Sequence, residues 1–371
     1  MSADARRAAL KQLVDETAGW RAAPAILQPA DLYFDLAGEA IGARLLLTSG
    51  EDGTEYCLRP EFTLAVAAEY LTSELAGTGQ AIGYLGPVFR QRQGGPAEFE
   101  QAGLEFLGPV AGDPFDRSLA FAFAAAKIYG VDTPELHLGA VDLFEALLAG
   151  VDMPDMWRPR IRARFGHKEA LAQLLDRLAA PETTELADRY PAERGKLIAV
   201  IASEMEQAGL SPISGREAAE IADRHLEKRA LAAARVPEAT VQILRLYLGI
   251  AGEARAQLSR LEKLAVDASV DLAALVADTG LDLREPIARL ASRINAIAAH
   301  FKPGIIRFDA AFSPPLDYYT GHVFELVAPK TKAIIASGGR YDRLLERLGS
   351  AKPIPAVGCA VWLDRLEEAG S

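Results

Sequence analysis

The segment Leu316-Asp-Tyr-Tyr-Thr-Gly321 is the most informative stretch of this chain, and the apolar run His322–Val327 follows it directly. A Thr-Gly pair before an apolar run predicts a turn that leads into a β-strand. Paired tyrosines at such a place are usually amphipathic core residues, with an apolar ring and a hydroxyl that needs a partner. By itself the segment is therefore compatible with a packed core as well as with a binding pocket.

The regions around this segment alternate between strand and helix patterns. Further strands are predicted at Ile305–Ala310, Lys332–Ala336, Ala356–Val361, Ile82–Leu85 and Glu100–Leu107, and in a hairpin of 44–48 and 56–58 around the Gly50–Gly53 turn. Helices are predicted over 4–17, from Pro60 to about Leu75, and over 114–129. Residues 151–300 are rich in Leu, Ala, Arg and Glu and have helical periodicity with almost no strand signal.

This distribution predicts an α+β fold with an antiparallel sheet flanked by helices, since several strand pairs are joined by short loops. We expect one discontinuous domain made of residues 1–150 and 301–371, interrupted by a helical insertion domain at 151–300. A chain of 371 residues is long enough for two domains of roughly 100–200 residues each.

Composition narrows the class of protein. There are 40 Lys and Arg against 51 Asp and Glu, so the net charge is −11, which argues against a protein that mainly grips phosphate backbones. The N-terminus is charged throughout and has no apolar core typical of a signal peptide, and no apolar run is long enough to span a membrane. Two cysteines in apolar surroundings, Cys57 and Cys359, are typical of reduced, buried thiols. We expect a cytoplasmic protein without membrane contact.

Four segments carry charged residues, aromatics or glycines within apolar runs: 57–64, 86–108, 316–325, and 337–342 together with 355–366. Glu61 stands at a predicted helix start, where a carboxylate caps the helix or forms an ion pair, while Gln101 and Glu105 share one face of a strand that borders either solvent or a pocket. The Gly338-Gly339 pair is interpreted as a helix start rather than a phosphate loop. None of the five histidines has the spacing of a metal site, so we expect neither metal nor cofactor.

In their order along the chain, these segments resemble the catalytic domain of class II histidyl-tRNA synthetases. The resemblance covers about 1–150 and 300–371 and rests on Leu58-Arg-Pro-Glu61, Gly86-Pro-Val-Phe-Arg90, Phe99-Glu-Gln-Ala-Gly-Leu-Glu105, Leu316-Asp-Tyr-Tyr-Thr-Gly321, Gly338-Gly-Arg-Tyr-Asp342, and Ala356-Val-Gly358 with Leu363-Asp-Arg365. It implies a class II aminoacyl-tRNA synthetase-like sheet of six antiparallel strands in a homodimer.

The resemblance also implies the contacts of a bound histidine. Glu61 and Thr63 would contact its α-ammonium group, and Arg90 would lie at its carboxylate. Gln101 and Glu105 would complete recognition of the amino group and the imidazole, and Tyr318 and Tyr319 would line the ring pocket. A free amino acid carries both charges, so acids and a base in a partly dry cavity suit it.

The positions that a synthetase uses for ATP and for activation differ here. Pro314 replaces an arginine that stabilises developing charge, a loss that typically costs about 10²–10³ in rate. Arg92 replaces a glutamate, Trp362 replaces a glycine that leaves room for adenine, and Phe62 replaces a glycine of bacterial synthetases. The loop Gln93–Ala97 lacks basic residues. A synthetase would continue beyond the position of Arg365 with an anticodon-binding domain, and we expect none in this protein.

Retained histidine contacts together with altered ATP positions resemble the regulatory subunits of short-form ATP phosphoribosyltransferase. That resemblance implies a non-catalytic subunit with no catalytic residues of its own and no tRNA partner. A catalytic partner chain would require this subunit in the first step of histidine biosynthesis, and the subunit would allow L-histidine to inhibit that step by feedback. It would form a homodimer within a hetero-oligomer. Two alternatives are a truncated synthetase-like enzyme that activates an amino acid for a non-tRNA acceptor, and a tRNA-binding sensor module.

Overall fold

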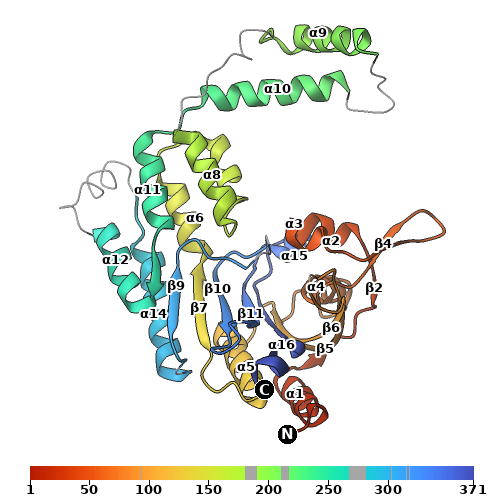
Figure 1. The fold of residues 1–371 in the computed structure, drawn as a ribbon, viewed down its shortest axis with the longest axis vertical. Helices are drawn as coiled ribbons and strands as arrows, with labels where there is room; N and C mark the ends of the chain where they lie inside the picture. Colours follow the sequence, from red (N-terminus) through yellow and green to blue (C-terminus); the bar gives the residue numbers. More distant parts are fainter. Residues whose placement is uncertain are drawn as a thin grey trace.

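The computed structural model describes residues 1–92, 94–179, 190–209, 217–266, 281–301, 303–314, 316 and 318–371. Its described strands form two sheets (Figure 1). In spatial order, the large sheet contains β1 (Trp20–Arg21), β5 (Gln80–Phe89), β6 (Glu98–Leu107), β12 (Ala356–Trp362), β11 (Ile334–Arg340), β10 (His322–Val327), β7 (Glu135–Ala140), β9 (Ile306–Asp309) and β8 (Ala251–Glu253). The small sheet contains β2 (Leu27–Pro29), β4 (Glu55–Leu58) and β3 (Leu47–Ser49).

The helices begin and end near the predicted bounds in the parts that were predicted individually. They are α1 (Ala3–Thr17), α2 (Asp31–Leu36), α3 (Glu39–Gly42), α4 (Thr63–Thr72), α5 (Pro114–Ile128), α6 (Val141–Gly150), α7 (Arg158–Arg162), α8 (Lys168–Ala179), α9 (Arg194–Gln207), α10 (Ala218–Ala233), α11 (Glu238–Leu248), α12 (Ala254–Val266), α14 (Arg284–His300), α15 (Leu344–Arg347) and α16 (Leu363–Ala369). The helix expected from Pro60 begins three residues later, because Glu61 caps its first turn from outside the helix.

The antiparallel sheet predicted from the sequence is confirmed, and it is wider than six strands. The run β5-β6-β12-β11-β10-β7 is antiparallel throughout. Beyond it, β1 and β9 pair in parallel with β5 and β7, and β8 pairs with β9. The predicted hairpin is also confirmed, since β3 and β4 pair on either side of the Gly50–Gly53 turn.

The interpretation of Gly338-Gly339 as a helix start is wrong, because both glycines lie inside β11. A Cβ on Gly338 would lie 2.4 Å from the carbonyl oxygen of Gly358, and one on Gly339 would lie 2.8 Å from that of His322. Glycine is therefore required there by close approach of neighbouring strands rather than by a turn.

The two faces of the large sheet differ in what packs against them. On one face, the Cys359 thiol reaches the carbonyl of Ser118 in α5 at 3.4 Å, and α1 packs against Gly83 of β5. On the other face, Gly339, Gly358 and Glu105 lie side by side on adjacent strands. The two glycines on this second face leave room above the sheet for side chains from elsewhere in the chain.

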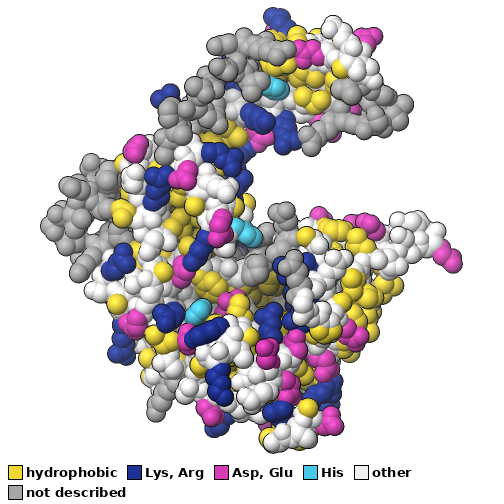
Figure 2. Space-filling model, in the orientation of Figure 1, with side chains coloured by type: hydrophobic (Ala, Val, Ile, Leu, Met, Phe, Trp, Pro, Cys, Tyr) yellow, Lys and Arg dark blue, Asp and Glu magenta, His cyan; other side chains and the backbone are white. Residues whose placement is uncertain are grey.

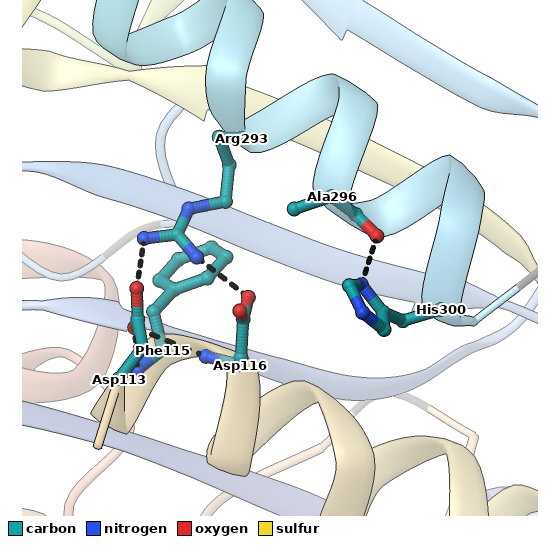
Figure 3. Close-up of polar contacts among 6 residues, drawn as sticks. All are labelled: Asp113, Phe115, Asp116, Arg293, Ala296 and His300. Atoms are coloured by element: carbon teal, nitrogen blue, oxygen red, sulfur yellow. Dashed lines mark hydrogen bonds and ion pairs between the residues drawn. The ribbon is translucent and has the colours of Figure 1, made fainter. Parts of the chain in front are cut away.

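Parts of the predicted insertion belong to the main core. Helix α14 contributes Ile287, Leu290, Ile294 and Ile297 to the same buried cluster as the sheet, and β8 extends the sheet edge. In Figure 3, Arg293 of α14 reaches the N-terminus of α5, where its guanidinium pairs with Asp113 at 2.8 Å and Asp116 at 2.5 Å above the ring of Phe115. The division at residues 151 and 300 remains a prediction, but α14 belongs to the main buried cluster.

Helices α9 and α10 form a separate arm. Their apolar residues Leu197, Ile201 and Ala222 form a small cluster apart from the main core. Figure 1 shows the pair extending away from the sheet, and Figure 2 shows an open hollow between it and the body of the molecule.

Candidate functional site

Glu61 lies just before α4 and is held by the start of that helix. Its two oxygens accept hydrogen bonds from the backbone amides of Thr63 at 2.6 Å and Leu64 at 2.8 Å. Only 6% of the residue is exposed. Burial raises the pKa of this carboxyl, and the two amide donors together with the nearby Arg90 guanidinium oppose that rise. The capping role expected from sequence is thus real, but it holds a carboxylate in a buried place.

Glu105 on β6 is the centre of a hydrogen-bond network and is 1% exposed. One carboxylate oxygen accepts from the hydroxyls of Thr63 at 2.6 Å and Tyr84 at 3.2 Å, and the other accepts from the hydroxyl of Tyr341. Burial raises the pKa of Glu105 to about 8, with repulsion from Glu61 adding to it and the three hydroxyls opposing it.

Gly358 on β12 makes this arrangement possible. A Cβ there would lie 1.7 Å from a Glu105 carboxylate oxygen and 2.7 Å from the Tyr341 hydroxyl. Any side chain at this position would displace the carboxylate.

Three tyrosines pack together beside the carboxylates. The ring centres of Tyr318 and Tyr319 are 5.1 Å apart, and the ring of Tyr341 lies 5.4 Å from Tyr318 and 6.3 Å from Tyr319. All three are buried. Burial raises the pKa of Tyr318 well above its ordinary value, and the charges of Glu61 and Glu105 add to this effect. The tyrosines therefore form an apolar wall with neutral hydroxyls.

Arg90 and Gln101 retain unused hydrogen-bonding capacity. Burial lowers the pKa of Arg90 to about 10, although attraction to Glu61 favours its charged form. Its guanidinium lies 5.0 Å from the ring centre of Phe99 and makes no hydrogen bond to the described residues. The side-chain oxygen of Gln101, which is 2% exposed, has no hydrogen-bond partner among them either. A bound polar ligand could satisfy both groups.

The side chains at the positions predicted to differ from the ATP contacts of a synthetase are engaged in contacts within the chain. Arg92 pairs with Asp364 at 2.7 Å and lies 4.1 Å above the ring of Phe99. The indole of Trp362 neighbours Gln101 across the β12–β6 ladder, and Arg365 lies 4.6 Å above that indole. Arg365 also donates to the carbonyl of Ile334 at 2.8 Å, so its half-buried guanidinium is held by contacts within the chain.

Pro314 lies in the loop before β10, where its carbonyl accepts from the backbone amide of Leu316 at 2.7 Å. A proline side chain offers neither charge nor donor to a developing anion. Pro315, Asp317 and Gln93 lie outside the described residues.

The structure brings together five of the residues predicted to bind histidine. Hydrogen bonds link Glu61 to Thr63 and Thr63 to Glu105. Tyr341, which donates to Glu105, also makes ring contacts with Tyr318 and Tyr319. Arg90 is tied to them through its attraction to Glu61, and Gln101 shares the strand face of Glu105. Their role in binding histidine remains a prediction.

Sequence reasoning missed Tyr84, Tyr341 and the part played by Phe62. The ring of Phe62 lies between the Arg59 guanidinium at 3.9 Å and the Tyr84 ring at 4.4 Å, so it supports the tyrosine that donates to Glu105. Tyr341 and Gly358 lie in two of the motifs that support the family resemblance, so the motifs could have indicated both residues as part of the site. Tyr84 carried no signal beyond its place in a strand.

Two further properties concern the described residues. No cluster of three or more His, Cys, Asp or Glu side chains that could hold a metal ion was found among them. Likewise, no helix in these ranges combines the length and the apolar character needed to cross a membrane.

Comparison with known proteins identifies relatives over nearly the whole chain. The histidyl-tRNA synthetase family profile matches residues 3–209 and 206–366. The ATP phosphoribosyltransferase regulatory subunit of Brucella ovis is 39% identical over 357 residues, which are 92% of this chain and 91% of that protein. The protein of the same name from Brucella abortus is also 39% identical, over 92% of this chain and 90% of its own.

Solved structures share the fold. A Bacillus halodurans protein described as an ATP phosphoribosyltransferase regulatory subunit/histidyl-tRNA synthetase has a TM-score of 0.64 at 19% identity, covering 99% of this chain and 78% of that one. A histidine–tRNA ligase subunit from Alicyclobacillus acidocaldarius has a TM-score of 0.59 at 24% identity, covering 98% and 92%. With this fold, and with 39% identity to the Brucella proteins over almost its full length, the chain belongs to the family of ATP phosphoribosyltransferase regulatory subunits, which have the histidyl-tRNA synthetase fold.

Proposed function

We propose that this protein regulates the catalytic subunit of ATP phosphoribosyltransferase and that L-histidine is its effector. The observation that carries the proposal is the convergence of two buried carboxyls, Glu61 and Glu105, with the tyrosine wall. The ammonium of a bound amino acid would face Glu61, and an imidazole would find Glu105 and Tyr341 as hydrogen-bonding partners. Arg90 would face the carboxylate.

The same pocket is poorly suited to amino-acid activation. Arg92 is paired with Asp364, Arg365 is held on Trp362, and Pro314 supplies no charge. A site that keeps the amino acid without activating it suits a sensor, since occupancy can then persist as a signal. These contacts support a non-catalytic role over a truncated amino-acid-activating enzyme.

The regulation follows from linkage. If histidine binds one state of the complex more tightly, it shifts the population towards that state, and the partner's substrates must alter histidine affinity by the same factor. We further propose a homodimer within a hetero-oligomer that works in the cytoplasm, where its two free, buried cysteines stay reduced.

Isothermal titration with L-histidine tests the pocket directly. Glu105→Ala should weaken binding by at least about tenfold, because a buried polar group of the ligand that is left without its hydrogen-bond partner costs about 1–3 kcal/mol. Glu285→Ala is a matched control, since that side chain is 84% exposed on α14. Histidinol, which lacks the carboxylate, should bind more weakly than histidine if Arg90 holds that group.

Reconstitution with the short catalytic chain tests the regulation. The proposal expects co-elution, a change in the rate of the partner, and inhibition by histidine that Glu105→Ala or Tyr319→Ala reduces without dissolving the complex. Absence of both co-elution and any effect on activity would overturn it. Histidine-dependent exchange of pyrophosphate into ATP by this chain alone would instead favour the enzyme alternative, and salt-dependent binding of tRNA would favour the sensor module.

A further inference from the structure

The short helix α7 lies between the candidate pocket and the α9–α10 arm. The guanidinium of Arg162 donates to the backbone carbonyl of Tyr319 at 2.8 Å and to the carboxylate of Glu145 in α6 at 2.7 Å. A residue outside the motifs of the pocket thus holds the backbone of a tyrosine that forms its wall.

The same helix touches the arm at its other end. The indole N–H of Trp157, just before α7, donates to the carbonyl of Ala234 at the end of α10 at 2.7 Å. Arg160 forms an ion pair with Glu227 inside α10. Side chains within six positions of each other therefore reach both the pocket and the arm.

The segment that carries these contacts is anchored in the core, so it can transmit a displacement. Ile161 is fully buried, and the ring of Phe165 stacks on Phe144 with centres 4.3 Å apart. Gly166 lies close to Ser313, where a Cβ would come within 3.1 Å of the serine side chain. The arm, in contrast, has its own small apolar cluster and stands apart from the sheet (Figure 1), so it can move as a unit.

We propose that Arg162 is a positioning residue for the pocket and that α7 couples occupancy of the pocket to the orientation of the α9–α10 arm. The inference rests on the proposed binding of histidine. Ligand packed against the Tyr319 ring fixes the backbone of that residue, Arg162 fixes α7 relative to it, and Trp157 with Arg160 fixes the arm. By reciprocity, a change in the arm contacts alters histidine affinity.

The first experiment measures histidine affinity and thermal stability of the whole chain for Arg162→Ala and Arg162→Lys. The alanine variant should bind histidine about tenfold more weakly, with the lysine variant in between because it retains one charged donor. Arg245→Ala is the control, since it removes an arginine paired with Asp176 between α11 and α8. A merely structural role would lower the melting temperature and leave affinity within twofold.

The second experiment follows hydrogen exchange with and without histidine in the wild type and in Trp157→Phe, which keeps an aromatic ring but lacks the indole N–H. Histidine should slow exchange in α7 and α10 of the wild type, and the effect on α10 should be lost in the variant. Unchanged exchange in α10 of the wild type would overturn the coupling.

The outcomes separate the two proposals. If the wild type binds no histidine, the proposed function fails. If the wild type binds histidine and Arg162→Ala binds it equally well, the inference fails while the function stands.

Discussion

Glu105 makes the stability of this protein depend on pH in a way that a single substitution tests. Its pKa is raised from an ordinary value near 4.5 to about 8 in the folded chain, chiefly by burial. Between these values the folded state holds a proton that the unfolded state has released. Stability therefore falls as pH rises from about 4.5 to about 8, and this contribution is level on either side.

The magnitude follows from the interval. At about 1.4 kcal/mol for each pH unit, ionising Glu105 lowers the free energy of unfolding by about 5 kcal/mol between pH 4.5 and pH 8. Glu105→Gln keeps the size of the side chain and its ability to hydrogen-bond but cannot ionise. The variant should consequently gain about 4 kcal/mol over the wild type as the pH is raised from 5 to 9, because the wild type loses about 1.4 kcal/mol for each unit from pH 5 to pH 8 and nothing further above it.

Urea denaturation at pH 5, 7 and 9 measures the difference, and the exposed Glu285→Gln is the control for loss of a carboxyl. Comparison of variant with wild type cancels the slopes of other groups, such as Glu325, whose pKa burial raises to about 7. Parallel pH profiles for wild type and Glu105→Gln would refute the reasoning, because they would mean that the carboxyl is not desolvated in the folded chain.

Three other predictions concern the surroundings of this carboxyl and the packing of α14. Gly358→Ala should lose about 1–3 kcal/mol in urea denaturation and should weaken histidine binding, because its Cβ would lie 1.7 Å from a Glu105 oxygen, while Gly95→Ala, with no atom within 4 Å, should change neither. Tyr84→Phe removes a hydroxyl donor to Glu105, so the pKa of that carboxyl should rise further and stability should go on falling at higher pH in the same titration. Arg293→Ala removes two ion pairs with partly exposed carboxylates and a contact with the Phe115 ring, and should lower the free energy of unfolding by about 1–2 kcal/mol.

Local pattern predicted much of the architecture. The strand His322–Val327 has the observed bounds, because a Thr-Gly turn precedes a short apolar run and a proline follows shortly after it. The N-terminal helix is equally close to its expected bounds. In the helix, burial follows the helical period at Leu10 and Val14, whereas the strand is a short apolar run that is buried along nearly its whole length, and both patterns are legible in the sequence.

Long-range contacts decided what the pattern could not. Gly338-Gly339 looks like a break in the sequence, yet it lies in a strand because neighbouring backbones come too close for a side chain. The helical periodicity of residues 151–300 predicts that the helix Arg284–His300 belongs to the insertion domain. In the structure, Arg293 and four apolar residues pack this helix against the main core.

By itself, the sequence determined the sheet-and-helix composition, the acidic charge, and the kinds of residue available for an amino-acid site. Tertiary structure decided that Glu105 is a buried carboxyl held by hydroxyls from three distant segments, at Thr63, Tyr84 and Tyr341. It also decided that Arg162 donates a hydrogen bond to the backbone carbonyl of Tyr319. The physical reason is that desolvation and hydrogen bonding depend on which residues surround a group in space, and residues from 63 to 341 meet only when the sheet has formed.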